Sequence, residues 1–290
     1  MKINWFLGII SSFPIFISGE ILETDSIETI YSHVEEDTLV LLGMTDTITD
    51  SVLQVGSQPW RYLIRKLLST IQDIYQPGNL HDQWTYKVET SVPVKAVQPE
   101  MIEWINYLQQ RGIPVFCVTG RGRNLWYSTP TPDVDVLTER VLQSVGVDFS
   151  KTKIPKALLK VDSQFFYKGI FYCARWNRKG ELLSQIFQDV NYRPKKIVMV
   201  DVKLDQLKCM EKKMQETGIP GVYVLYQKTA KNFKSFNSKG ALLQLKFLIE
   251  ESQLLGDAEA AEKILPLSSP SLEEYFKELF SISLSYQDCR

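Results

Sequence analysis

Short apolar runs recur along this chain, and three of them end in glycine, threonine or aspartate, at Gly43, Thr119 and Asp201. Unbroken runs of about four to eight apolar residues, without polar alternation, are typical of parallel strands that are buried on both faces. The run at 39–42 is the clearest, because it breaks directly into Gly43 and a Thr-Asp-Thr loop. The pattern predicts strands at about 38–43, 114–118, 164–172, 196–201 and 221–226.

Between these runs, apolar residues recur every three or four positions, which is the spacing of an amphipathic helix. One such helix begins at Pro99 and is closed by Arg111 and Gly112, since glycine is common just past a helix end. Because parallel strands need right-handed helical crossovers, we expect an α/β fold with one mostly parallel sheet flanked by helices. The other helices are expected at about 20–37, 62–75, 133–145, 177–183, 207–214 and 240–255, followed by a solvated tail with a small amphipathic piece at 272–280.

The composition fits one main α/β domain with an insertion. The chain has 290 residues, of which 44% are hydrophobic and 11% aromatic, enough for a sizeable core. The 33 basic and 34 acidic residues nearly cancel, so no overall field favours nucleic acid, and we expect no nucleic-acid partner. The two histidines, His33 and His81, are far apart in the sequence, which argues against a histidine-rich zinc site.

The first 19 residues have the pattern of a signal peptide. A single lysine precedes an apolar segment of about 15 residues, which Ser11, Ser12 and Pro14 interrupt. A membrane anchor is the alternative, but a spanning helix needs about 20 apolar residues. We therefore expect export to the periplasm, the cell envelope or the medium, with no stable transmembrane span after cleavage. The spacing of the four cysteines leaves the question of disulfides open.

Candidate site residues follow the predicted strands, because ligands of open α/β sheets bind beyond the carboxyl ends of the strands. The 43–46 loop should line such a site after the first strand. After the second strand, Thr119 and Gly120 can present a hydroxyl group and a backbone N–H to an anion. Arg121 or Arg123 could add charge-assisted hydrogen bonds. The alternative is a strand-to-helix turn with solvated arginines.

Charged residues also stand at the ends of later predicted elements. Lys179 opens a predicted helix, where the helix dipole disfavours a cation, so that an anion nearby should offset it. Asp201 ends the fourth predicted strand, and Asp205 follows it closely. These two carboxylates are a weak candidate site for a cation such as Mg²⁺.

The end of the first strand resembles the first motif of the haloacid dehalogenase (HAD) superfamily, Asp-x-Asp-x-Thr. In that family the first Asp attacks a phosphoryl group and binds magnesium, and the second is the general acid. Here Gly43 stands at the nucleophile position and Thr45 at the general-acid position, while Thr47 matches. The resemblance therefore implies a known fold from which much of the chemistry has been removed.

The later HAD motifs are better kept. Thr119 matches the second motif, whose hydroxyl group holds a phosphoryl oxygen, and Lys179 matches the lysine of the third motif, which neutralises the phosphoryl group. Asp201 matches one of the paired magnesium carboxylates of the fourth motif, but its neighbour is Val202. The competitors for the role of the lysine are Lys168, Arg175 and Arg178.

The resemblance covers about 34–251 and is closest to an uncharacterised family of exported bacterial HAD-like proteins. The usual members of that family keep four carboxylates in the first and fourth motifs, and three of these are missing here. The runs that carry the resemblance are LQQRGIPVFCVTGRG, GVDFS, KGIFY, NRKGELL and IVMVDVKLDQLKCME. It implies a HAD-like domain at 20–255 with a helical cap insertion at about 48–97, between the signal peptide predicted at 1–19 and the C-terminal tail predicted at 256–290.

Three hypotheses about function follow from the missing nucleophile. The aspartyl-phosphate route needs a carboxylate, which Gly43 cannot supply, so the first hypothesis is a catalytically inactive protein that binds a phosphorylated small molecule or a protein partner. The second is an active phosphohydrolase that uses Asp46, three residues past the nucleophile position, with Mg²⁺ as the one cofactor to consider. The third is a structural or surface-interaction protein whose pocket is filled by side chains.

Overall fold

The computed structural model describes residues 21–70, 72–73, 75–174, 179–264 and 274. The predicted signal peptide at 1–19 lies outside the described residues, as do Arg175 and Arg178. The amphipathic piece predicted at 272–280 also lies outside them, apart from a single residue. Within the described part of the chain, no helix combines the length and the apolar character needed to cross a membrane.

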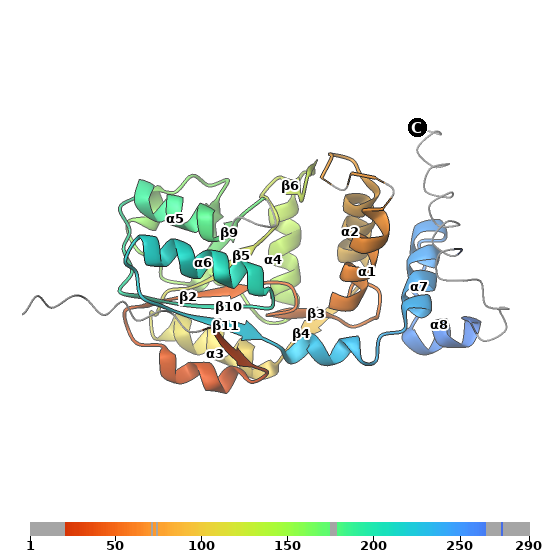
Figure 1. The fold of residues 1–290 in the computed structure, drawn as a ribbon, viewed down its shortest axis with the longest axis horizontal. Helices are drawn as coiled ribbons and strands as arrows, with labels where there is room; N and C mark the ends of the chain where they lie inside the picture. The colour runs from red at the N-terminus through yellow and green to blue at the C-terminus, as the bar shows by residue number, and fades with distance from the viewer. Residues whose placement is uncertain (1–20, 71, 74, 175–178, 265–273, 275–290) are drawn as a thin grey trace, which may run out of the picture.

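Seven strands form the central sheet, and all neighbouring pairs run parallel except one antiparallel pair at the edge. Helices flank the sheet (Figure 1), which confirms the predicted α/β class with a mostly parallel, Rossmann-like sheet. The strand order is β1 (Ile21–Thr24), β11 (Gly221–Tyr226), β10 (Lys196–Asp201), β2 (Thr38–Gly43), β5 (Val115–Thr119), β9 (Ile170–Tyr172) and β8 (Phe166–Tyr167).

Two predicted elements differ in the structure. The strand expected at 164–172 is the hairpin of β8 and β9, because Lys168 and Gly169 both have positive φ and turn the chain between them. The helix expected at 20–37 is the strand β1 followed by a short 3-10 helix, η1 (Ile27–His33). β1 pairs with the edge of β11, and this contact with a distant segment outweighs the local helical spacing.

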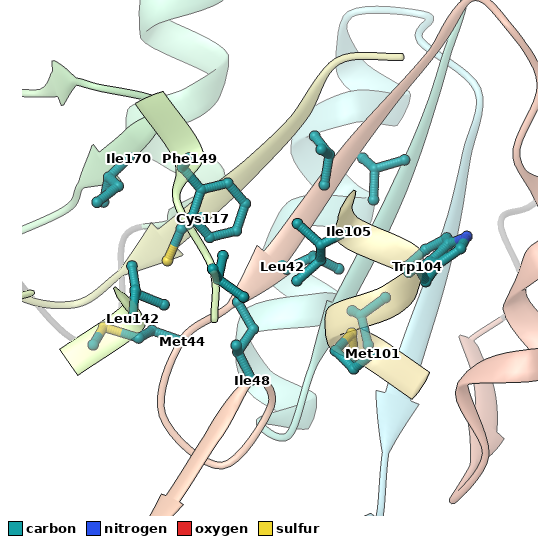
Figure 2. Close-up of a cluster of buried hydrophobic side chains, with 14 of the residues drawn as sticks. Leu42, Met44, Ile48, Met101, Trp104, Ile105, Cys117, Leu142, Phe149 and Ile170 are labelled. Atoms are coloured by element: carbon teal, nitrogen blue, oxygen red, sulfur yellow. The ribbon is translucent and has the colours of Figure 1, made fainter. Parts of the chain in front are cut away.

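Both faces of the sheet are buried beneath helices. β2 sends Val40 and Leu42 into the core shared with α3 (Pro99–Gln110) and α4 (Val134–Ser144), and Leu39 and Leu41 into the core shared with α5 (Lys179–Asp189) and α6 (Leu204–Glu216). Figure 2 shows Leu42 beside Ile105 of α3 in the first of these cores. Each fully buried aliphatic side chain of this kind contributes about 1.5–3 kcal/mol. This two-sided burial explains why the strands lack polar alternation.

A helical cap lies beyond the carboxyl ends of the sheet strands (Figure 1). The chain enters the insertion through β3 (Thr49–Ser51), forms α1 (Gln58–Leu68) and α2 (Leu80–Ser91), and leaves through β4 (Val94–Ala96), which pairs antiparallel with β3. A helix from much later in the chain, α7 (Ser238–Glu250), packs against both α1 and α2. The core of the cap contains Trp60, Ile64, Trp84, Val88, Leu242 and Leu245. We use "cap" for these three helices, α1, α2 and α7.

The segment after α7 is more ordered than the sequence pattern predicts. Residues from 256 onward were expected to be a solvated tail, but α8 (Asp257–Ile264) packs on α7 through Leu243, Leu255 and Ala260. A helix of eight residues is too short to be stable in isolation, so α8 depends on its contact with α7. The remaining short elements are β6 (Leu125–Trp126), β7 (Thr129–Pro130), η2 (Phe149–Lys151), η3 (Leu158–Lys160) and η4 (Lys228–Phe233). The described cysteines, Cys117, Cys173 and Cys209, are all free.

Candidate functional site

A cavity of about 290 Å³ lies at the carboxyl ends of β2, β5 and β10, beneath α1 of the cap. We call it the inner cavity. Among the candidate residues named from the sequence, eight line it: Thr45, Asp46, Thr119, Gly120, Arg121, Lys179, Asp201 and Asp205. Segments that are more than 150 residues apart in the chain therefore meet at one edge of the sheet, as parallel strands require.

Lys179 and Asp201 form a buried ion pair, with 2.6 Å between Nζ and Oδ2. Burial alone would lower the pKa of Lys179, but the adjacent Asp201 carboxylate outweighs it and raises the pKa above its ordinary value. Asp201 also accepts a hydrogen bond from the backbone N–H of Lys203 at 3.0 Å. Asp201 is therefore the anion that offsets a cation in the first turn of α5. Lys168 bonds to Glu139 instead, at 2.8 Å, and does not line the inner cavity.

Gly43 does not line the inner cavity, contrary to the expectation for the 43–46 loop. It is buried at the end of β2, where a Cβ atom would lie 2.7 Å from the Thr47 hydroxyl oxygen and 3.1 Å from Oδ2 of Asp201. The Thr47 hydroxyl is itself buried and makes no hydrogen bond within the described part of the chain. Any side chain at position 43 therefore requires Thr47 to move.

Asp46 lies at the boundary between the sheet and the cap. Its backbone has a φ of 67°, and its N–H donates to the carbonyl of Thr49 at 2.7 Å. Its carboxylate bonds to Arg61 of α1. Burial raises the pKa of Asp46 to about 6, although Arg61 opposes this shift. Asp46 therefore faces the cap, and it loses its charge far closer to neutral pH than an ordinary aspartate.

Cationic side chains outnumber carboxylates around the inner cavity. The cations are Arg61, Arg65, Arg121, Lys179 and Lys203, against three carboxylates. Two of the arginines stand four residues apart on α1, a spacing that could have been recognised in the sequence. The state of Lys203 could not, because burial in the folded protein lowers its pKa to about 7, so that it is only partly charged at neutral pH.

The loop after β5 brings Thr119, Gly120 and Arg121 to the inner cavity, as its sequence suggested, but not Arg123. Gly120 borders the inner cavity, and a Cβ atom there would meet nothing within 4 Å. Arg121 also borders it, but its guanidinium group is held by Glu89 at 2.9 Å and by the Thr138 hydroxyl at 3.1 Å. Arg123 does not border it and bonds to Asp135 at 2.8 Å. The anion-facing part of the loop is therefore Thr119 and Gly120 rather than Arg123.

The carboxylates of this edge do not fit a magnesium site. Mg²⁺ is usually held by one or two carboxylates in octahedral oxygen coordination. Asp201 is bonded to Lys179, and Asp205 is exposed and accepts a hydrogen bond from Gln206 at 3.2 Å. No cluster of three or more His, Cys, Asp or Glu side chains that could hold a metal ion occurs in the described ranges. Asp201 and Asp205 as arranged here therefore do not form a magnesium site.

The fold and the cavity define an α/β protein with a Rossmann-like sheet and a cationic site at the carboxyl ends of its strands, roofed by a helical cap. The chain belongs to the family described as "Protein of unknown function (DUF2608)", whose model matches residues 23–261. It is also similar to an uncharacterized protein of Rickettsia bellii (strain RML369-C). The two are 21% identical over 208 residues, which cover 68% of this chain and 70% of the relative.

Proposed function

We propose that this chain is an exported protein with a HAD-like, phosphatase-type fold, which binds a phosphorylated ligand and does not hydrolyse it. The observation that carries the proposal is the inner cavity, where Arg61, Arg65, Arg121 and Lys179, with Lys203 partly charged beside them, outnumber three carboxylates. Thr119 and Gly120 supply a hydroxyl group and an open backbone edge at the same place. Together these groups suit a phosphate group, which is an anion with several strong acceptor oxygens.

The absence of turnover in this proposal rests on Gly43. An aspartyl-phosphate intermediate needs a carboxylate at the end of β2, and Gly43 is enclosed by Thr47 and Asp201. Loss of a catalytic nucleophile costs about a millionfold in turnover in a well-studied protease. Lys179 and Asp201, which would serve the reaction in an active relative, bond to each other instead.

Asp46 supports a second candidate, an active phosphohydrolase with a displaced carboxylate. It lines the inner cavity, and its pKa of about 6 suits proton transfer near neutral pH. Its bond to Arg61 and its orientation toward the cap favour the inactive protein. The open volume of about 290 Å³ argues against the third hypothesis, in which side chains fill the pocket.

Calorimetric titration of the protein with inorganic phosphate, in the presence of a metal chelator, tests the proposal. We expect binding in the millimolar range, and we expect the double variant Lys179→Ala, Asp201→Asn to abolish it. The double variant avoids leaving Asp201 as an unpaired buried charge, which would confound the result with unfolding. Lys213→Ala is the matched control, because Lys213 bonds to Glu216 on the far end of α6 and is not part of the cavity.

An assay with several phosphomonoesters and magnesium separates the two candidates. The proposed function predicts no release of phosphate above background. Phosphate release that Asp46→Asn abolishes would overturn the proposal and establish the displaced carboxylate in its place. Failure of the native protein to bind phosphate, without turnover, would leave only an interaction with a protein partner.

A further inference from the structure

A second hollow adjoins the inner cavity on the side of η4 and α6. This outer cavity has a volume of about 600 Å³ and is bordered by the end of β11, by η4 and by the first turns of α6. The two cavities share five lining residues: Gln58, Tyr62, Val202, Lys203 and Asp205. They therefore form one continuous groove, of a size that suits a small organic molecule.

The two ends of this groove differ in chemistry. Lysines border both ends, with Lys208 at the outer end, but only the outer end has two aromatic rings, Phe233 of η4 and Tyr62 of α1, which also borders the inner cavity. The ring centroids are 5.8 Å apart, and the two residues, Tyr62 and Phe233, are 55% and 48% exposed. Leu204, also exposed, lies at the same end. Large aromatic rings that stay open to water beside a hollow are typical of a surface that binds a flat apolar group.

The wall of the outer cavity also carries polar groups. Gln58 and Gln227 supply carboxamides, and Asp205 supplies a carboxylate. Such groups match the donor and acceptor edges of a nucleobase or the hydroxyl groups of a ribose. They do not suit an acyl chain, which would need a continuous apolar wall, and a simple phenyl ring would leave them without a ligand partner.

We propose that the groove binds a nucleoside monophosphate, with its phosphate group in the inner cavity and its base against Tyr62 and Phe233. The inference rests on the proposed function, because it takes the inner cavity as the phosphate site. It adds the class of the ligand and two residues that recognise it. Stacking accepts any base, so the aromatic pair provides affinity while the carboxamides and Asp205 select among the bases.

The test compares ligands that share a phosphate group and differ at the other end. The native chain is titrated calorimetrically with inorganic phosphate, ribose 5-phosphate, AMP, UMP and phosphotyrosine. We expect AMP to bind at least about tenfold more tightly than ribose 5-phosphate, the gain typical of one stacked base. Ribose 5-phosphate should in turn bind about as weakly as inorganic phosphate.

Tyr62→Ala and Phe233→Ala locate the base. Each should weaken AMP binding by about tenfold. Phe233→Ala should leave the affinity for inorganic phosphate unchanged, because Phe233 lines the outer cavity and not the inner one. Tyr107→Ala is the matched control: Tyr107 is 54% exposed on α3 and lines neither cavity. AMP binding should be the same in this control as in the native protein.

The outcomes separate this inference from the proposed function. Binding of phosphate with no preference for AMP over ribose 5-phosphate overturns the nucleotide assignment and leaves the phosphate site standing. Equal affinity for phosphotyrosine and AMP overturns it as well, because the polar wall would then have no role. Absence of phosphate binding overturns both proposals. Loss of phosphate binding in Phe233→Ala would show that the ring supports the fold rather than the ligand.

Discussion

Two groups of charged residues border the inner cavity, and they differ in what they connect. On the sheet side, Lys179 of α5 and Asp201 of β10 bond to each other at 2.6 Å. Both residues belong to the α/β core, so this ion pair does not connect the core to the cap. In the proposed function, Asp201 therefore competes with the phosphate group for Lys179.

On the cap side, the charged residues link separate parts of the molecule. Arg61 of α1 bonds to Asp46 in the loop after β2 and lies 3.9 Å from Glu89 of α2. Glu89 in turn bonds to Arg121 in the loop after β5, at 2.9 Å. This group therefore ties the cap to two strand ends, and any change in its charge acts on the position of the cap.

The two groups also respond differently to pH. The pKa of Lys179 is raised by Asp201, so the cation of the sheet side stays charged at neutral pH. The pKa of Asp46 is raised to about 6 by burial, so the cap side loses an anion in mild acid. The sheet side is therefore the half of the site with a constant cation near neutral pH, while the charge of the cap side depends on pH.

The largest effect is expected for Lys179→Met. Removing the lysine leaves Asp201 buried without its cation, and breaking a buried pair in this way costs about 3–5 kcal/mol. Urea unfolding at pH 7 measures the change in the free energy of unfolding. Lys213→Met removes an exposed pair on α6 and should leave the urea midpoint unchanged. Equal midpoints for the two variants would show that the sheet pair is not the constant half of the site.

Gly43→Ala tests how closely the sheet side is packed. The added methyl group meets the Thr47 hydroxyl oxygen at 2.7 Å, and overpacking of a buried site costs about 1–3 kcal/mol. In the double variant with Thr47→Ala the hydroxyl group that blocks the methyl group is gone. The loss of unfolding free energy in the double variant should therefore be smaller than the sum of the losses in the two single variants. Gly120→Ala is the control, since a Cβ atom there meets nothing within 4 Å. Additive costs in the double variant would contradict the enclosure of Gly43.

The pH response of the cap side is tested with Asp46→Asn. With a pKa of about 6 when folded and 3.8 as the ordinary value, Asp46 binds its proton more tightly in the folded protein. Between about pH 4 and pH 6 the folded state therefore holds more protons, so its stability falls as pH rises through this window and is level above it. In the native protein this lowers the free energy of unfolding by about 1–3 kcal/mol between pH 4 and pH 6, and Asp46→Asn should not show this decrease. Urea unfolding from pH 4 to pH 7 gives the free energy of unfolding of both proteins at each pH. If the two proteins changed in parallel with pH, the raised pKa of Asp46 would be refuted.

The smallest effect is expected for Asp201→Asn. Removing the negative charge releases Lys179 toward the cavity, so phosphate should bind with unchanged affinity or up to about tenfold more tightly. Calorimetric titration with inorganic phosphate measures it, alongside the native protein at the same ionic strength. Weaker binding would mean that Asp201 positions Lys179 for the anion instead of competing with it.

Periodicity in the sequence predicted the main strands closely. β2 and β10 were expected at 38–43 and 196–201, and the structure places them at the same residues. A strand that is buried on both faces needs apolar residues at consecutive positions, so an apolar run in the sequence indicates such a strand directly. The meeting of Thr119, Lys179 and Asp201 followed from topology alone, because parallel strands bring their carboxyl ends to one edge.

Other features depended on segments that meet only in the folded chain. The strand β1 exists because the edge of β11 offers it backbone partners, and α7 belongs to the cap because its apolar side packs on α1 and α2. The pKa of Asp46 is likewise set by its burial and by Arg61, which opposes the shift. Gly43 is enclosed by Thr47 and Asp201. Local sequence patterns were enough to place the central strands β2, β5, β10 and β11 and the charges that follow them, but not β1 or the hairpin of β8 and β9. Tertiary structure alone decided which charges pair and how far burial shifts them, because desolvation depends on everything that surrounds a group.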